Sequence, residues 1–254
     1  MMHEVRLITE NVYILGTMHI SKQSSATVKA SIESLSPKWV LLELDAERYA
    51  FLKKKEKGSK PQTAPKQGTA LPSQVSPSTF TPTPPAQAPQ ESSDEFLDLL
   101  YQFQLHLGDL LNLTPGQEML TAINIIEVLG LKFALIDRPL SHTLQRLQDL
   151  FSVDSKEHKS FQSQVDQLKH ELDAQKLQKI LADFQNPARI HEILAEMQSQ
   201  YPQLTQILLT ERNEYMAGQV IKMWHQHPHD KILVIVGAAH LDALIQIIQQ
   251  KLKP

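Results

Sequence analysis

The first part of the chain alternates short apolar runs with amphipathic stretches. Two β-rich runs within residues 5–16, VRLI and VYILG, are separated by three polar residues and predict a β-hairpin. Apolar residues at helical spacing then predict a helix that ends before Pro37. The run WVLLEL, residues 39–44, is apolar almost throughout, which is typical of a strand covered on both faces.

The same alternation returns later in the chain. TPGQEML predicts a helix with Thr114 as its N-cap, and Gly130 is expected to end it. KFALID, residues 132–137, predicts the next strand, and ILVIVG, residues 232–237, predicts a last strand followed by a final helix. Strands separated by helices at these intervals predict the α/β class, with a central sheet flanked by helices. The pattern leaves the order of the strands open.

Two long segments interrupt this alternation. Residues 53–93 contain eight prolines among Ser, Thr, Gln and Ala, and this composition predicts a disordered insertion. Residues 154–200 are almost wholly of helical pattern, rich in Gln and Leu, and are expected to form a helical arm inserted between strands of the sheet. The core would therefore consist of residues 1–52, 94–153 and 201–254.

The composition excludes several classes of function. The chain has 25 basic and 28 acidic side chains and no cysteine, so it predicts no nucleic-acid partner, no disulfide framework and no cysteine nucleophile. Its N-terminus lacks the pattern of a secretory signal, and no apolar run reaches the roughly 18 residues of a membrane span. We expect a soluble, cytoplasmic protein without an integral membrane segment. A homo-oligomer is compatible with the sequence.

A glycine followed three residues later by a histidine closes two of the apolar runs. GTMH places Gly16 before His19, and GAAH places Gly237 before His240. In α/β sheets the ligand site forms beyond the carboxyl ends of the strands, so both histidines are expected at one edge. The glycines would allow the backbone to turn sharply and to approach a ligand closely.

Charged residues follow the two remaining strand ends. They are Glu43 and Asp45 after one strand, and Asp137 and Arg138 after the other. Two imidazoles and a carboxylate can hold a divalent metal, so His19, His240 and Glu43 are the predicted ligands. Glu43 could instead act as general base on a water that the metal activates. The alternative is that each histidine only satisfies a hydrogen bond at the end of its strand.

Two further clusters contain polar residues that could serve a site. In ERNEYMAGQV, Glu211, Arg212 and Asn213 are expected near the start of a helix, where they form either part of the site or a charged surface. HQHPHD, residues 225–230, has the alternating histidines of a metal-binding tract, but its proline and its place before a strand favour an exposed turn.

Six motifs together resemble the TraB/PrgY family. In chain order they are GTMHIS, WVLLELDAERY, GQEML, IDRPLSHTLQRL, ERNEYMAGQV and VIVGAAHL. The Tiki membrane proteases look like relatives, as do, more distantly, erythromycin-esterase and ChaN-like proteins. The resemblance implies an α/β core with a duplicated βα architecture and a site around the two G-x-x-H elements. In the Tiki relatives that site is attributed to manganese or cobalt and the activity to peptide cleavage.

The resemblance also assigns roles by motif. The residues carried over to the site are His19, Glu43, Arg212, Asn213 and His240. Glu43, Arg212 and Asn213 would be catalytic, the last two by holding the scissile carbonyl, and Arg138 and Glu211 would contact the substrate.

Three functions remain in competition. The first is a metal-dependent hydrolase that acts on peptides. The second is a protein that binds a peptide or small ligand in the same pocket without turnover, with residues 154–200 covering a groove. The resemblance allows both functions, because the family members that block a peptide pheromone would do so by sequestration or by degradation. The third is an architectural protein whose site has decayed, against which the charges at the strand ends argue.

Overall fold

The computed structural model describes residues 5–17, 22–59, 116–152, 163 and 187–252. The elements are, in chain order, β1 (Arg6–Leu7), β2 (Val12–Thr17), α1 (Lys22–Leu35), β3 (Trp39–Leu42), α2 (Ala46–Ser59), α4 (Gln117–Leu129), β4 (Lys132–Leu135), α5 (Leu140–Ser152), α8 (Pro187–Gln200), α9 (Pro202–Thr205), the π-helical turn η1 (Gln206–Thr210), α10 (Glu211–Gln226), β5 (Ile232–Gly237) and α11 (Ala238–Lys251). In these ranges no helix has the length and apolar character needed to cross a membrane. The predicted α/β class is confirmed.

The five strands form one sheet in the order β1-β2-β5-β3-β4. β1 and β2 are antiparallel, which confirms the predicted hairpin, whereas β2, β5, β3 and β4 are mutually parallel. Thr17 is paired with Gly237, and Leu42 is paired with both Ile235 and Leu135. The carboxyl ends of four strands therefore meet at one edge of the sheet, which we call the carboxyl edge.

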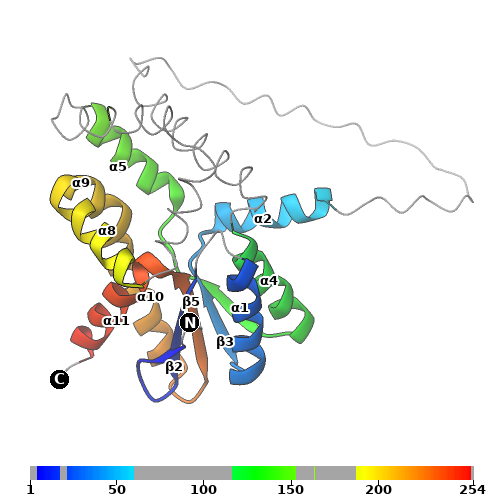
Figure 1. The fold of residues 1–254 in the computed structure, drawn as a ribbon. Coiled ribbons are helices and arrows are strands. Elements are labelled where there is room, and N and C mark those ends of the chain that lie inside the picture. The colour runs from blue at the N-terminus through cyan, green and yellow to red at the C-terminus, as the bar shows by residue number, and fades with distance from the viewer. Residues whose placement is uncertain (1–4, 18–21, 60–115, 153–162, 164–186, 253–254) are drawn as a thin grey trace, which may run out of the picture.

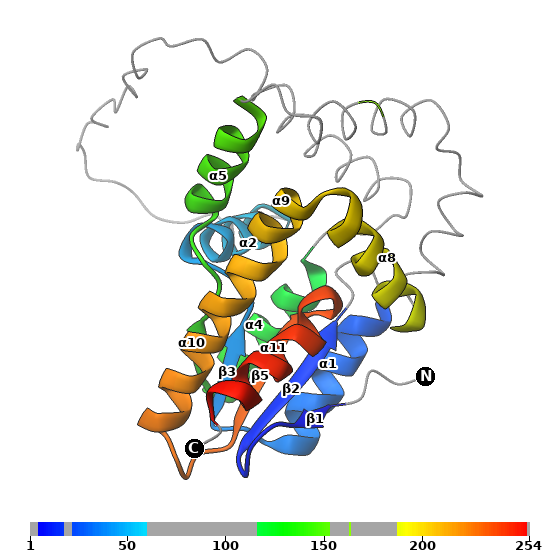
Figure 2. The same ribbon diagram turned by 90° about the vertical axis from the view of Figure 1, so that its left-hand side faces the viewer.

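Helices cover both faces of the sheet. α1 and α4 pack on one face, and α10 and α11 pack on the other (Figures 1 and 2). Successive residues of a strand contribute to opposite cores, as Leu15 does to the first and Ile14 to the second. This alternation confirms that the apolar run of β3 is buried on both sides, with Val40 and Leu41 facing different helical layers.

A third apolar cluster lies away from the sheet. α5 and α9 lie above the carboxyl edge (Figure 1). The cluster consists of Leu147, Leu150, Tyr201, Leu204 and Ile207, with Met197 and Leu208 packed against it. α8 begins at Pro187 and α9 at Pro202, and proline is favoured at the first position of a helix. Of the predicted arm, only α8 and residue 163 are described.

Some boundaries differ from those expected. α4 begins at Gln117, and its N-cap is Gly116 with φ 80°, so the helix does not start from Thr114, which itself lies outside the described residues. Gly130 does end this helix, at a left-handed φ of 63°. α2 continues past residue 53, where the insertion was expected to begin, to Ser59. The rest of that insertion lies outside the described residues.

Candidate functional site

Glu43 lies at the centre of the carboxyl edge, directly after β3. Its backbone N–H still donates to the carbonyl of Ile235, so the residue stays beside β5. The side chain is only 3% exposed, and its Oε2 accepts the backbone N–H of Gly237 at 2.6 Å. Gly237 is the N-cap of α11, where the positive end of the helix dipole favours a carboxylate. One oxygen of Glu43 is thereby fixed at the start of α11.

His240 lies in the first turn of α11 and is held between two side chains. Its Nδ1 is 2.6 Å from Oδ1 of Asn213, and its Nε2 is 3.3 Å from Oε1 of Glu43. Because an amide oxygen only accepts, Nδ1 carries the hydrogen and Nε2 faces the carboxylate. In the neutral ring, two lone pairs would then meet. A proton or a metal cation between the two atoms relieves that repulsion.

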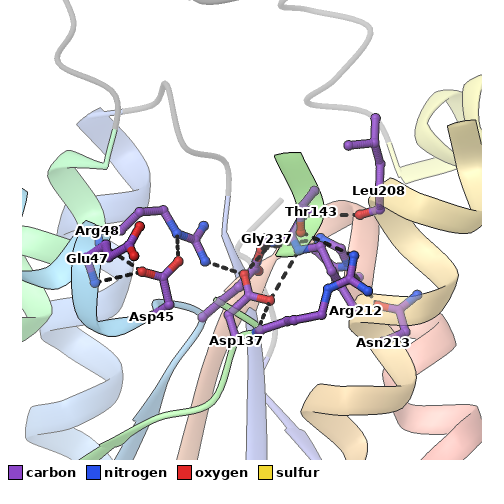
Figure 3. Close-up of polar contacts among 12 residues, drawn as sticks. Asp45, Glu47, Arg48, Asp137, Thr143, Leu208, Arg212, Asn213 and Gly237 are labelled. Carbon is purple, nitrogen blue, oxygen red and sulfur yellow. Dashed lines mark hydrogen bonds and ion pairs between the residues drawn. The ribbon is translucent and has the colours of Figure 1, made fainter. Parts of the chain in front are cut away.

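Asp137, after β4, is shared by two arginines that approach it from opposite sides (Figure 3). Arg212 on α10 donates to it through Nε at 3.2 Å and Nη2 at 2.6 Å, and the same Nη2 is 2.6 Å from Oε1 of Glu43. Burial is the largest single influence and opposes ionisation of Asp137. The hydrogen bond and charge of Arg212, with the charge of Arg48, outweigh it and hold the pKa of Asp137 below its usual value. The site therefore contains ionised and mutually neutralised groups.

Arg48, on α2, is the second arginine on Asp137, and the sequence did not identify it. Its Nη2 donates to Asp137, and its Nε donates to Oδ2 of Asp45 at 2.8 Å. A usable signal was its spacing, because an arginine three residues after Asp45 in a helix that follows a strand end can reach back to that aspartate. Three carboxylates, of Asp45, Asp137 and Glu43, thus share two guanidinium groups.

Arg138 and Glu211, the predicted substrate contacts, bind each other. Nη1 of Arg138 is 2.6 Å from Oε2 of Glu211, and Arg146 on α5 reaches the other oxygen at 3.0 Å. Burial tends to raise the pKa of Glu211, but the hydrogen bonds and charges of the two arginines outweigh it and lower the pKa. Arg138 also donates to Oγ1 of Thr143 at 3.2 Å. This second cluster ties α5 to α10 beside the first.

A π-helical turn directly precedes these α10 residues. Glu211, Arg212 and Asn213 were expected near a helix start, but they lie inside a continuous helical run that begins at Pro202. They directly follow η1, whose Leu208 carbonyl accepts Nη1 of Arg212 at 3.1 Å. This hydrogen bond ties the guanidinium of Arg212 to the π-helical turn on the same side as the carboxyl edge. The alternative of an exposed charged surface is wrong for Asn213, which is buried.

The two glycines of the G-x-x-H elements do not make sharp turns. Gly16 lies inside β2, and a Cβ there would be 2.8 Å from Cδ2 of Leu241, so the glycine permits close packing of α11. Gly237 has φ −63° and ψ 147°, an extended conformation open to any residue. Its contribution is the backbone N–H that Glu43 accepts.

Two of the three predicted metal ligands can be placed. His19 lies outside the described residues, although Thr17, two residues earlier, pairs with Gly237. Within the described ranges, no three His, Asp or Glu side chains are grouped for a metal ion. Glu43 Oε1 and His240 Nε2 are, however, 3.3 Å apart, which fits two donors that each bind one ion at about 2.0 to 2.2 Å.

The histidine-rich stretch HQHPHD belongs to the opposite end of the sheet. Its first two residues end α10, and the remaining four form the turn before β5 that the sequence predicted. The ring of His227 stacks on Trp39 with centroids 4.4 Å apart, and His229 is exposed. These histidines therefore lie at the end of the strands opposite the carboxyl edge.

Comparison with known proteins agrees with the motifs. The sequence model of the TraB/PrgY/gumN family matches residues 1–251. An uncharacterized protein of Methanocaldococcus jannaschii is 27% identical over 244 residues, which cover 94% of this chain and 54% of the relative. The chain thus spans about half the length of this relative.

Proposed function

The chain belongs to the TraB/PrgY/gumN family, as its motifs predicted, and on that premise we propose that it is a metal-dependent hydrolase that acts on peptides. One observation carries the proposal. Nε2 of His240 faces Oε1 of Glu43 at 3.3 Å, while Asn213 holds the other ring nitrogen. A histidine that donates one N–H to an oxygen and presents its second nitrogen beside a carboxylate has the usual orientation of a metal ligand.

The proposed ligands are His240, Glu43 and His19. The assignment of His19 rests on the sequence, in which it follows β2, the direct neighbour of β5. A divalent metal such as Mn, Co or Zn would supply an activated water near neutral pH. Its positive charge would also complement the local balance of three carboxylates against two guanidinium groups.

The neighbouring residues have positioning roles in this proposal. Asn213 fixes the tautomer and the ring direction of His240, and the Gly237 N–H fixes Oε2 of Glu43. In the alternative in which Glu43 is not a ligand, its Oε1 would instead take a proton from the activated water. Arg212 donates a hydrogen bond from Nη2 to Oε1 of Glu43, and its positive charge partly offsets the negative charge of the carboxylate. Contacts of Arg212, Arg138 and Glu211 with a substrate stay predictions.

Metal content and peptide cleavage test the proposal together. The protein is reconstituted with Mn, Co or Zn, its bound metal is measured by mass spectrometry, and a peptide library is analysed for cleaved products. His19→Ala and His240→Ala are expected to lose both metal and cleavage. His229→Ala, an exposed histidine of the opposite turn, is the matched control and should retain both. Retained cleavage in His240→Ala would refute the assignment.

Sequestration without turnover is the second candidate. It is favoured by the pairing of Asp137 and Glu43 with Arg212, because a carboxylate neutralised by a guanidinium is a weaker base. Calorimetric titration with the same peptides separates the two functions. Saturable binding with intact peptide recovered afterwards would support sequestration, whereas cleaved fragments would support the hydrolase.

A further inference from the structure

We propose that Arg48 is a positioning residue of the candidate site. By holding Asp137, it keeps Arg212 shared between Asp137 and Glu43, and so sets the charge and position of the Glu43 oxygen that faces His240. Arg48 and Glu43 act on each other through two intermediate side chains. The inference concerns the chain's own residues, and only its consequence for metal binding and turnover rests on the proposed function.

Arg48 is itself fixed before it reaches Asp137. Oδ1 of Asp45 accepts the backbone N–H groups of Glu47 and Arg48 at 2.8 and 2.9 Å, which caps the start of α2. Oδ2 of the same aspartate accepts Nε of Arg48 at 2.8 Å. One side of the guanidinium is thereby anchored at the end of β3, and Nη2 is directed at Asp137 (Figure 3).

The sharing of Arg212 depends on that second guanidinium. Oδ2 of Asp137 accepts from both arginines, and Nη2 of Arg212 is 2.6 Å from Asp137 and 2.6 Å from Glu43. Without Arg48, the fully buried Asp137 would depend on Arg212 for its compensating charge. Arg212 would then turn its Nε and Nη2 fork entirely onto Asp137, which draws Nη2 away from Oε1 of Glu43.

This rearrangement has opposite effects on metal affinity and on turnover. In Arg48→Gln, the network loses one positive charge, and Arg212 no longer offsets the negative charge of Glu43. We therefore expect Mn²⁺ to bind about three- to tenfold more tightly. Turnover should fall, because Oε1 is no longer held by Arg212. Arg48→Lys restores the charge but not the fork that bridges Asp45 and Asp137. It should return the Mn²⁺ affinity toward wild type while turnover stays low.

A double-mutant cycle in the metal-free protein tests the coupling directly. Unfolding by urea is measured for Arg48→Gln, Glu43→Gln and the double variant. Removing the charge of Glu43 leaves Asp137 as the one carboxylate paired with Arg212 instead of two, so Arg48→Gln should cost less in that background. We expect the unfolding constants to deviate from additivity by at least about threefold. Arg48→Gln with Asp230→Asn, at the opposite end of the sheet, is the control and should be additive. Additivity in the first cycle would overturn the proposal.

A crystal structure of Arg48→Gln gives a second test if Glu43→Gln does not fold. Nη2 of Arg212 is expected beyond hydrogen-bonding distance of Oε1 of Glu43, with both fork nitrogens on Asp137. An unchanged Arg212–Glu43 contact would overturn the proposal. A wild-type protein that binds no metal would refute the proposed function but would leave both of these tests intact.

Discussion

The two ends of the sheet carry similar residues in different arrangements. At the carboxyl edge, Asn213 holds His240, and Arg212 pairs with Asp137. At the opposite end, which we call the amino edge, the corresponding residues are Asn11, His227, Lys38 and Asp230, with Lys38 and Asp230 2.8 Å apart. Nδ2 of Asn11 donates to the carbonyls of His227 and Asp230 at 3.2 and 2.7 Å.

The difference lies in burial and in the kind of partner. The side chains of Asp137 and Glu43 are 0% and 3% exposed, whereas those of Asp230 and Lys38 are 20% and 56% exposed. Asn11 binds backbone carbonyls and so closes a turn, while Asn213 binds a titratable side chain. Burying charged groups costs desolvation free energy even when the groups neutralise one another. Their presence at the carboxyl edge therefore indicates a functional site there, whereas the exposed turn at the amino edge carries no such cost.

Substitution of the two aspartates should give the largest contrast. Asp137→Asn removes a buried charge from two arginines and is expected to cost about 3 to 5 kcal/mol of unfolding free energy. Asp230→Asn breaks a partly exposed pair, so its cost should be much smaller. Urea denaturation monitored by far-UV circular dichroism measures both. Equal losses would mean that burial does not distinguish the two edges.

Substitution of the two asparagines should distinguish a role in positioning His240 from a role in stabilising the fold. Asn213→Ala removes the acceptor that orients His240, and loss of such a partner lowers metal affinity by about 10- to 100-fold. Asn11→Ala should destabilise the turn yet leave the metal affinity unchanged. Titration with Mn²⁺ or Zn²⁺, followed by calorimetry, compares the variants at equal folded fraction. Weakened binding in Asn11→Ala alone would reverse the assignment of the two edges.

Lowering the pH should reduce the unfolding free energy differently at the two edges, because their carboxylates lie in different surroundings. The pKa of Asp137 lies below its ordinary 3.8, because Arg212 and Arg48 outweigh the opposing effect of burial. A lowered folded-state pKa stabilises the protein above the unfolded value, and this contribution is lost as the pH falls through the folded value. The pKa of Asp230 is also lowered, chiefly by its hydrogen bond to Lys38, but at an exposed pair that salt screens.

The measurement is the unfolding free energy between pH 2.5 and 6 in low salt and in 1 M NaCl. Asp137→Asn should flatten the acid slope in both conditions. Asp230→Asn should change it only in low salt. An acid slope that Asp137→Asn leaves intact would show that Asp137 gains no stabilisation from its arginines.

The sequence predicted the elements that carry the site better than it predicted their contacts. Strand ends could be located because the apolar runs of β3 and β4 are closely followed by acidic residues, and the parallel order then brings Glu43 and Asp137 to one edge. The contact of Arg48 with Asp45 could have been inferred from their spacing, but its contact with Asp137 could not, because Asp137 is 89 positions away. The π turn before Glu211 leaves no periodic signal, so three consecutive residues were expected at a helix start.

The smallest effect is expected from His227. Its ring stacks on Trp39 at 4.4 Å, so His227→Ala should lose about 1 kcal/mol or less of unfolding free energy. Metal affinity and peptide cleavage should be unchanged, since the ring lies at the amino edge. His229→Ala, an exposed neighbour without a described ring contact in this turn, is the control for general effects of losing a histidine. A fall in metal affinity in His227→Ala would place the metal site at the amino edge. The buried network at the carboxyl edge could then no longer be assigned the function, nor the exposed turn a purely structural role.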